Sequence, residues 1–254
     1  MVAIEYRDIS KKFEGSSAYS VSHVSAKINE GELITILGSS GCGKTTLLKM
    51  TNRLLSPNEG QIILFGEDIQ TVDETVVRRR MGYVIQQIGL FPHKTIEENI
   101  AMIPKLQKWD REKIHNRVTE LLLLVGLDPE EYRKRYPKQL SGGQQQRIGL
   151  ARALVTNPKI MLLDEPFGAI DAITRLNLQN ELIRIHQETK KTMLLVTHDI
   201  NEAFKLGNRV MVMDGGKLLQ FDTPGNIVKN PKDAFVKSLV DSAREQNAFW
   251  EDID

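Results

Sequence analysis

Short apolar runs recur along the chain and predict its buried strands. They occupy residues 33–37, 160–163, 193–196 and 210–213. Apolar and polar residues instead alternate over 2–9 and 21–28, which predicts two strands with one exposed face, and 61–65 and 82–85 are typical of shorter strands. Because apolar strands separated by helices are typical of parallel sheets covered on both faces, we expect an α/β fold with a mostly parallel sheet.

From about residue 87 to residue 157 the pattern changes to apolar residues spaced three or four apart, which predicts helices. The expected helices there are 95–101, 110–125 and 144–155. We therefore expect a helical subdomain of about residues 87–157 inserted into a main domain of residues 1–232, with a helical tail at 233–254. Outside the subdomain we expect helices at 73–80, 172–188 and 199–206 and a hairpin-type turn at 29–32.

Composition and charge exclude several classes of protein. The 254 residues carry 34 Lys and Arg against 33 Asp and Glu, a net charge of +1, which is not the basic balance of a nucleic-acid binder. The single cysteine, Cys42, fits a reducing compartment and excludes an internal disulfide. The start of the chain lacks the apolar core of a signal peptide, and the apolar run 121–125 is too short to span a membrane. We expect a cytoplasmic protein that reaches a membrane only through partner subunits.

A glycine-rich stretch lies between the predicted strand 33–37 and a predicted helix. It consists of Gly38, Ser39, Ser40, Gly41, Cys42, Gly43, Lys44, Thr45 and Thr46. The spacing G-x-x-x-x-G-K-[ST] in a strand–loop–helix context is the phosphate-binding P-loop, in which backbone N–H groups converge on phosphate. Lys44 adds charge for the β- and γ-phosphates, and the Thr45 hydroxyl is placed to ligate Mg²⁺. The alternative is a glycine-rich turn without a ligand, which the context disfavours.

Two carboxylates follow the apolar strand 160–163. In a P-loop fold such a strand supplies a metal-organising acid, and Asp164 is in that position. Glu165, one residue later, is placed to hold and deprotonate the water that attacks the γ-phosphate. The alternative is that both acids only cap a strand at the surface, and the presence of a P-loop earlier in the chain disfavours it.

Residues 140–147 predict a second anion-binding helix start. Ser141 can cap the helix, Gly142 and Gly143 leave backbone N–H groups uncovered, and Gln144 follows them. An ordinary helix cap is the alternative, but it does not account for both glycines.

With these motifs the chain resembles the ATP-binding-cassette (ABC) ATPases over roughly residues 2–230, and 140–147 resembles their signature motif. The resemblance implies a RecA-like core, an N-terminal antiparallel β-subdomain, and ATP with Mg²⁺ held by Thr45, Gln86 and Asp164. Further implied roles are Gln86 as the Q-loop glutamine, Asp171 as the D-loop aspartate of Gly168-Ala169-Ile170-Asp171, His198 as the switch histidine, and Phe13 as the residue that stacks on adenine. Glu165, His198 and Lys44 are the implied catalytic residues.

The resemblance also implies partners. Two copies would pair head to tail, with ATP between the P-loop of one copy and Ser141–Gln144 of the other, on the cytoplasmic face of a membrane. Residues 51–55 and 82–93 resemble the osmoprotectant branch, whose importers use permease subunits and a substrate-binding protein or domain to carry glycine betaine, carnitine or choline. Many relatives append regulatory CBS domains, for which residues 232–254 leave no room, and this puts osmotic gating in doubt.

Other functions remain as alternatives. These are an importer ATPase for another small solute, a soluble cassette ATPase acting on nucleic acid or ribosomes, and a P-loop kinase. Only 97 positions (141 − 44) separate Lys44 from Ser141, too few for the coiled coil of the DNA-repair members. A kinase would not need the helix start at Ser141. An importer subunit without a nucleic-acid partner is the favoured interpretation.

Overall fold

The structure is a computed structural model that describes residues 1–86, 89–168 and 170–251. The chain divides into two compact units. The terminal unit comprises Met1–Arg78 and Thr192–Asp254, and the central unit comprises Arg79–Lys191. Helices alternate with parallel strands, as expected for an α/β fold.

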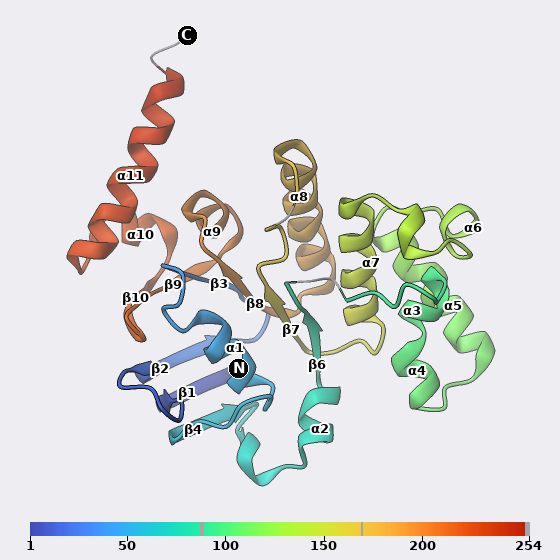
Figure 1. Ribbon diagram of the computed structural model, residues 1–254, viewed down its shortest axis with the longest axis horizontal. Helices are drawn as coiled ribbons and strands as arrows, with labels where there is room; N and C mark the ends of the chain where they lie inside the picture. The colour runs from blue at the N-terminus through green and yellow to red at the C-terminus, as the bar shows by residue number, and fades with distance from the viewer. Residues whose placement is uncertain (87–88, 169, 252–254) are drawn as a thin grey trace. The chain divides into compact units, whose positions relative to one another are not determined.

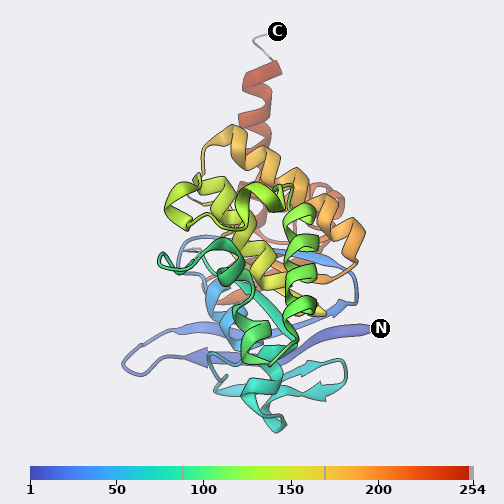
Figure 2. The same ribbon diagram turned by 90° about the vertical axis from the view of Figure 1, so that its right-hand side faces the viewer.

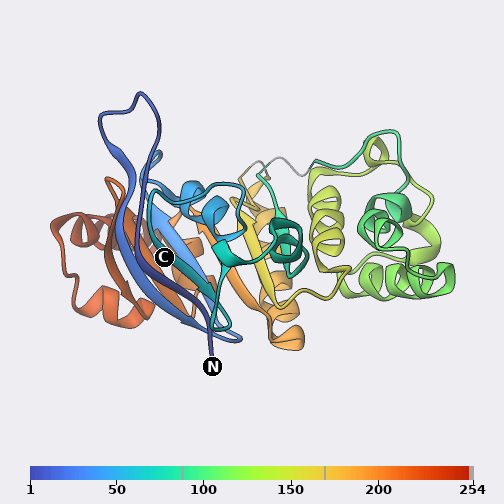
Figure 3. The same ribbon diagram turned by 90° about the horizontal axis from the view of Figure 1, so that it is seen from below.

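An antiparallel sheet begins the terminal unit. Its order is β2-β1-β4-β5, formed by β2 (Tyr19–Asn29), β1 (Val2–Lys12), β4 (Glu59–Leu64) and β5 (Glu67–Asp68). Tyr6 pairs with Ala26 on one side and Ile62 on the other, and all three side chains are buried. The alternating pattern therefore places one face of this sheet in a core. The β1–β2 loop projects from the sheet in Figure 3.

A second run of strands in the same unit has the order β10-β9-β3-β8. β3 (Leu33–Gly38), β8 (Thr192–Thr197) and β9 (Arg209–Asp214) are parallel, and β10 (Lys217–Asp222) is antiparallel to β9. Every residue of β3 and β8 is buried, which explains their apolar sequences. The parallel register aligns the carboxyl ends of the three strands at one edge, where α1 (Lys44–Thr51) and α9 (Ile200–Leu206) begin.

The remaining helices of the terminal unit are short, except the last. They are η1 (Ile69–Thr71), α2 (Glu74–Arg79, which ends one residue past the boundary), α10 (Pro224–Lys229) and α11 (Ala234–Glu251). Val236 and Val240 of α11 are buried against Leu37 and Ala203, so the first half of the helix closes the core beside β3. Its far end extends beyond α10 in Figure 1.

The central unit pairs two parallel strands, β6 (Met81–Val84) and β7 (Ile160–Asp164). Between them lie α3 (Ile96–Ile100), α4 (Met102–Leu106), α5 (Arg111–Leu124), α6 (Pro129–Tyr132), η2 (Pro137–Gln139) and α7 (Gly142–Leu154), and α8 (Ala172–Thr189) follows β7. α5 and α7 pack together (Figure 2). The expected helices are present, whereas α4 and α6 were not anticipated. The subdomain limits of about 87 and 157 remain a prediction, and residue 87 itself lies outside the described residues.

The hairpin expected at 29–32 is wrong. The backbone makes the tight turn, with Gly31 at φ 77° and the Glu32 N–H donating to the Asn29 carbonyl over 3.3 Å. However, β2 pairs with β1 and β3 pairs with β8 and β9, so the turn passes from one sheet to another. The Met193 N–H donates to the Glu32 carbonyl over 2.9 Å, which ties the start of β3 to β8 rather than back to β2.

Candidate functional site

The glycine-rich loop joins β3 to α1 in the terminal unit, and two of its glycines are sterically required. A Cβ on Gly38 would lie 2.0 Å from the carbonyl oxygen of Met213, and one on Gly43 would lie 2.0 Å from that of Ser20. Gly43 also has φ 103°, a conformation that side chains disfavour. Since Gly43 is the N-cap of α1 and offers no side-chain cap, no capping side chain competes with an anion at the start of this eight-residue helix.

Lys44 lies inside this loop, with 5% of its surface exposed. Its Nζ donates to the carbonyl oxygens of Gly38 at 2.9 Å and Ser39 at 2.7 Å. Thr46 Oγ1 and Ser20 Oγ lie 3.0 Å apart, which ties the loop to β2. Lys44 can exchange backbone carbonyls for phosphate oxygens without leaving the loop.

Two further side chains stand at the same strand edge. Thr197, the last residue of β8, pairs with Leu37, which places the exposed His198 beside the start of the loop. The Ser39 hydroxyl donates to Asp214 Oδ1 over 2.7 Å. The sequence predicted a role for His198, which stays a prediction, but did not point to Asp214, because Ser39 and Asp214 are 175 positions apart in the chain.

Two aromatic residues lie at either end of the β1–β2 loop. Phe13 is 43% exposed and Tyr19 is 40% exposed. Lys11 Nζ lies 5.7 Å from the Phe13 ring centroid, and Lys12 Nζ lies 5.7 Å from that of Tyr19. Each ring is therefore partly exposed and has a lysine ammonium near it, and the choice of Phe13 as the stacking residue stays a prediction.

In the central unit the two carboxylates differ in environment. Asp164 ends β7 with 5% of its surface exposed, and the Tyr83 hydroxyl donates to its Oδ2 over 3.4 Å. Burial, and then the Asp164 charge, raise the pKa of Tyr83 well above its usual range. Glu165 has φ 45°, which is rare for a residue with a side chain and is found disproportionately at active sites. Gln86 Nε2 donates to Glu165 Oε2 over 3.1 Å, so the predicted Q-loop and base residues are in contact.

The helix α7 begins in a capping box. The Gln144 N–H donates to Ser141 Oγ over 3.3 Å, and the Ser141 N–H donates to Gln144 Oε1 over 3.0 Å. Gln144 Nε2 donates to the Tyr132 hydroxyl over 3.0 Å, so both polar atoms of this amide are engaged within the chain. The Ser141 hydroxyl keeps its own proton to donate.

The two glycines of α7 differ. A Cβ on Gly143 would lie 2.5 Å from Cγ2 of Thr174 in α8, so packing requires this glycine. A Cβ on Gly142 would meet nothing within 4 Å. Packing within the chain does not require a glycine at 142, whereas an approaching anion would benefit from its uncovered N–H.

Asp171, the predicted D-loop aspartate, caps α8 by accepting from the Thr174 N–H over 3.0 Å. That backbone hydrogen bond, followed by the Thr174 side chain, lowers the pKa of Asp171. Ala169 of the predicted D-loop lies outside the described residues.

Residues 21–168 match the family model described as ABC transporter. The chain belongs to the ABC transporter family.

Relatives in this family cover nearly all of the chain. It is 48% identical over 241 residues to the carnitine transport ATP-binding protein OpuCA of Listeria monocytogenes, covering 95% of this chain and 60% of that protein. It is 47% identical over 236 residues to the glycine betaine uptake system ATP-binding protein YehX of Escherichia coli, covering 93% of this chain and 76% of that protein. The chain therefore spans about three-fifths of the OpuCA length. The solved structure of MJ0796, a dimeric bacterial ABC transporter cassette, superposes with TM-score 0.77 at 34% identity, covering 87% of this chain and 98% of that one.

The residues expected to hold Mg²⁺ in this ABC chain supply hard oxygen donors, namely the Thr45 hydroxyl, the Gln86 amide and the buried Asp164 carboxylate. This donor chemistry fits Mg²⁺. Within 1–86, 89–168 and 170–251 no group of three or more His, Cys, Asp and Glu side chains is placed to bind a metal. A Mg²⁺ that takes part of its coordination from nucleotide phosphates needs no such group.

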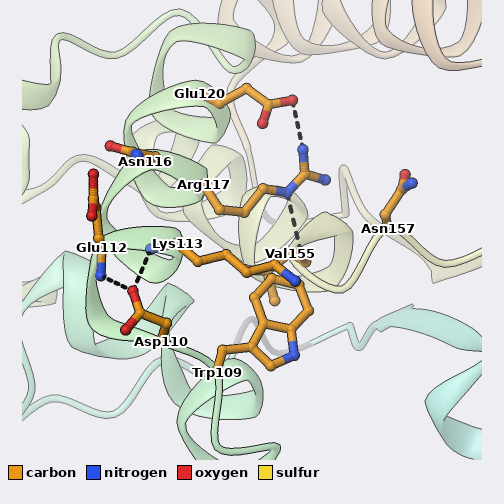
Figure 4. A pocket seen from close by; sticks show the side chains of 9 residues that line it. All are labelled: Trp109, Asp110, Glu112, Lys113, Asn116, Arg117, Glu120, Val155 and Asn157. Atoms are coloured by element: carbon orange, nitrogen blue, oxygen red, sulfur yellow. Dashed lines mark hydrogen bonds and ion pairs between the residues drawn. The ribbon is translucent and has the colours of Figure 1, made fainter.

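The opposite end of α7 is also anchored. Arg117 of α5 donates to the carbonyl oxygens of Leu154 at 2.9 Å and Val155 at 3.1 Å, which satisfies the helix C-terminus. Beside this contact is a hollow of about 640 Å³, where Lys113 Nζ lies 4.2 Å from the Trp109 ring centroid (Figure 4). Among the described residues that line it, none is a predicted site residue, so we interpret the contact as a structural clamp. No helix among the described residues combines the length and apolar character needed to cross a membrane.

Proposed function

We propose that this chain is the ATP-hydrolysing subunit of an importer for a quaternary-amine solute such as glycine betaine, carnitine or choline. It would act at the cytoplasmic face of the membrane, bound to separate permease subunits and supplied by a substrate-binding protein or domain. The observation that carries the proposal is 47–48% identity, over more than nine-tenths of the chain, to ATP-binding proteins named for carnitine transport and glycine betaine uptake.

Nucleotide binding rests on the terminal unit. The uncapped N–H groups at the start of α1 and the Lys44 ammonium supply positive charge for the phosphates. Phe13 stacks on the adenine, and His198 contacts the γ-phosphate. Lys44 is already held in the loop by two carbonyl oxygens, so phosphate replaces existing partners and little side-chain ordering is required.

Hydrolysis rests on the carboxylates of the central unit. Glu165 orients the attacking water and accepts its proton, which typically contributes about 10²–10⁴-fold in rate. Gln86, which donates to Glu165, aligns that carboxylate. When bound, Mg²⁺ neutralises phosphate charge, and Thr45, Gln86 and Asp164 are the residues that would hold it.

Two copies of the chain complete the site. The Ser141 hydroxyl and the N–H groups of Gly142 and Gly143 of one copy face the γ-phosphate bound to the other. Gln144 contributes through its capping box, because both polar atoms of its side chain are engaged within its own chain. Loss of the shared phosphate separates the copies, and this opening and closing is the change that a permease can use.

The Glu165→Gln variant tests the hydrolytic proposal, with Glu188→Gln, an exposed glutamate of the same unit, as the matched control. We expect Glu165→Gln to bind ATP, to lose hydrolysis by at least about 10²-fold, and to accumulate an ATP-bound dimer in size-exclusion chromatography. Hydrolysis at the wild-type rate in Glu165→Gln would show that another group activates the water.

A pull-down of the tagged chain from native membranes tests the importer proposal. A co-purified multi-span permease with a quaternary-amine-binding partner supports it. Recovery with ribosomes or DNA and no permease contradicts it, while leaving the hydrolytic proposal intact.

A further inference from the structure

Asp214 lies directly beside the phosphate-binding loop. β9 runs parallel to β3 with Met213 opposite Gly38, and the Met213 carbonyl oxygen occupies the space that a side chain on Gly38 would need. The residue after Met213 must therefore lie beside Ser39. The Ser39 hydroxyl donates to Asp214 Oδ1 over 2.7 Å, which fixes the carboxylate against the loop.

The turn between β9 and β10 does not explain this carboxylate. Asp214 pairs with Lys217, and Gly215 and Gly216 between them have φ 50° and 80°, as in a two-residue hairpin turn. Such a turn demands the two glycines but not an acid before them. The Asp214 side chain is directed to Ser39, so its role concerns the loop.

The charge of Asp214 acts on the inside of the loop. Burial raises the pKa of the Cys42 thiol, Lys44 lowers it, and the Asp214 carboxylate raises it again. Cys42 and Lys44 are both buried in the loop. Two opposite charges therefore act on one phosphate site, an ammonium within it and a carboxylate at its rim.

We propose that Asp214 is a positioning residue with an electrostatic role: it holds Ser39 in place and weakens the binding of nucleotide phosphates, which speeds the release of nucleotide. This inference rests on the proposed ATPase function. The physical reason is that a carboxylate near phosphate raises the free energy of the bound state by an amount that grows with the charge of the ligand. A loop with uncapped N–H groups and a buried lysine alone would retain nucleotide more tightly.

Three variants separate the charge from the hydrogen bond. Asp214→Asn keeps an oxygen that accepts from Ser39 but removes the charge. Ser39→Ala removes the hydrogen bond and keeps the charge. Glu30→Gln removes an equal charge from an exposed site before β3. Because β3 lies between Glu30 and the loop and a strand rises about 3.3 Å per residue, this charge is roughly 20 Å from the loop.

Dissociation constants for ATP, ADP and adenosine are measured by calorimetry at two salt concentrations. We expect Asp214→Asn to bind ATP about 3- to 10-fold more tightly at low salt, ADP by a smaller factor, and adenosine unchanged. The gain shrinks in high salt, because the screening length falls from about 10 Å at 0.1 M to about 3 Å at 1 M. In steady-state hydrolysis, KM for ATP falls and kcat does not rise. Ser39→Ala and Glu30→Gln do not tighten binding.

The inference is overturned if Asp214→Asn binds ATP no more tightly than the wild type, or if the gain is the same for adenosine and insensitive to salt. Equal tightening in Ser39→Ala would assign the effect to the lost hydrogen bond and also overturn the electrostatic role. A wild-type chain that binds neither ATP nor ADP refutes the proposed ATPase function instead, and this appears before any variant is compared.

Discussion

A methyl group added at Gly143 tests the packing of α7 against α8. The new Cβ would lie 2.5 Å from Cγ2 of Thr174, about 0.9 Å closer than an ordinary contact beginning at 3.4 Å. Thr174 cannot easily turn away, because β-branched side chains are stiff at χ1 and its N–H is held by Asp171. Overpacking of this kind costs about 1–3 kcal/mol, while replacing Gly by Ala in a helix returns up to about 1 kcal/mol. We expect Gly143→Ala to lower the free energy of unfolding by about 1–2 kcal/mol.

The assay is urea unfolding of the variant with two companions. Gly143→Ala combined with Thr174→Ser removes the clashing methyl group, so we expect most of the lost stability to return, since the next atoms lie 3.8 Å or more away. Gly142→Ala, one residue earlier and in open space, should unfold no more easily than the wild type, although it should weaken ATP-driven pairing by crowding the N–H group. A Gly143→Ala variant as stable as the wild type, or a double variant without recovery, would refute this packing argument.

Three further outcomes follow from groups described by the structure. The pKa of the Cys42 thiol is raised, chiefly by burial, so the thiol should stay protonated. Maleimide should therefore modify Cys42 more slowly than a free thiol between about pH 7 and 9, and a faster reaction would contradict this expectation. Burial of Glu32 raises the pKa of its carboxyl, but hydrogen bonds from Arg209 and the Asn29 N–H outweigh burial, so the pKa is lowered overall. The ionised carboxylate therefore stabilises the fold above its ordinary pKa, and this contribution is lost as pH falls. Thermal unfolding of Glu32→Gln should show a loss of about 1–2 kcal/mol at pH 7. This loss should shrink as pH falls below the ordinary pKa of the carboxyl and through its lowered pKa in the folded state, and a pH-independent loss would argue against the ionised pair. The side chain of Asn99 has 0% exposure and makes four hydrogen bonds to the backbone of residues 91–95. Asn99→Leu should therefore lower the free energy of unfolding, measured in urea, by about 3 kcal/mol or more. An unchanged free energy would mean that the segment rearranges.

The sequence predicted those strands and loops that a short stretch of neighbouring residues is enough to specify. The apolar runs at 33–37 and 193–196 became fully buried strands, because only strands covered on both faces need such sequences. The loop between β3 and α1 was predicted to bind phosphate because its glycines and Lys44 occur at a fixed spacing, and that role stays a prediction. β10 was missed because its alternation is broken and it lies at a sheet edge, with residues that range from buried to exposed.

What the sequence left open depends on contacts between distant segments. The turn at 29–32 has the local features of a hairpin, and only the pairing of β3 with β8 shows that it joins two sheets. The different constraints on Gly142 and Gly143 depend on Thr174, 31 positions further along (174 − 143). Asp214 acts on Ser39, 175 positions away, so its place beside the loop is visible only after β9 and β3 are aligned.

The positive φ of Glu165 means that laboratory evolution for stability would act against the proposed catalytic role of this residue. With φ at 45°, the residue occupies a region that costs a side chain on the order of 1 kcal/mol and that Gly or Asn adopts more readily. A library screened only for resistance to heat would therefore enrich Gly or Asn at this position and discard the carboxylate. Selection for a more heat-resistant protein must also screen for ATP hydrolysis, because without that criterion thermal selection favours replacement of the proposed base.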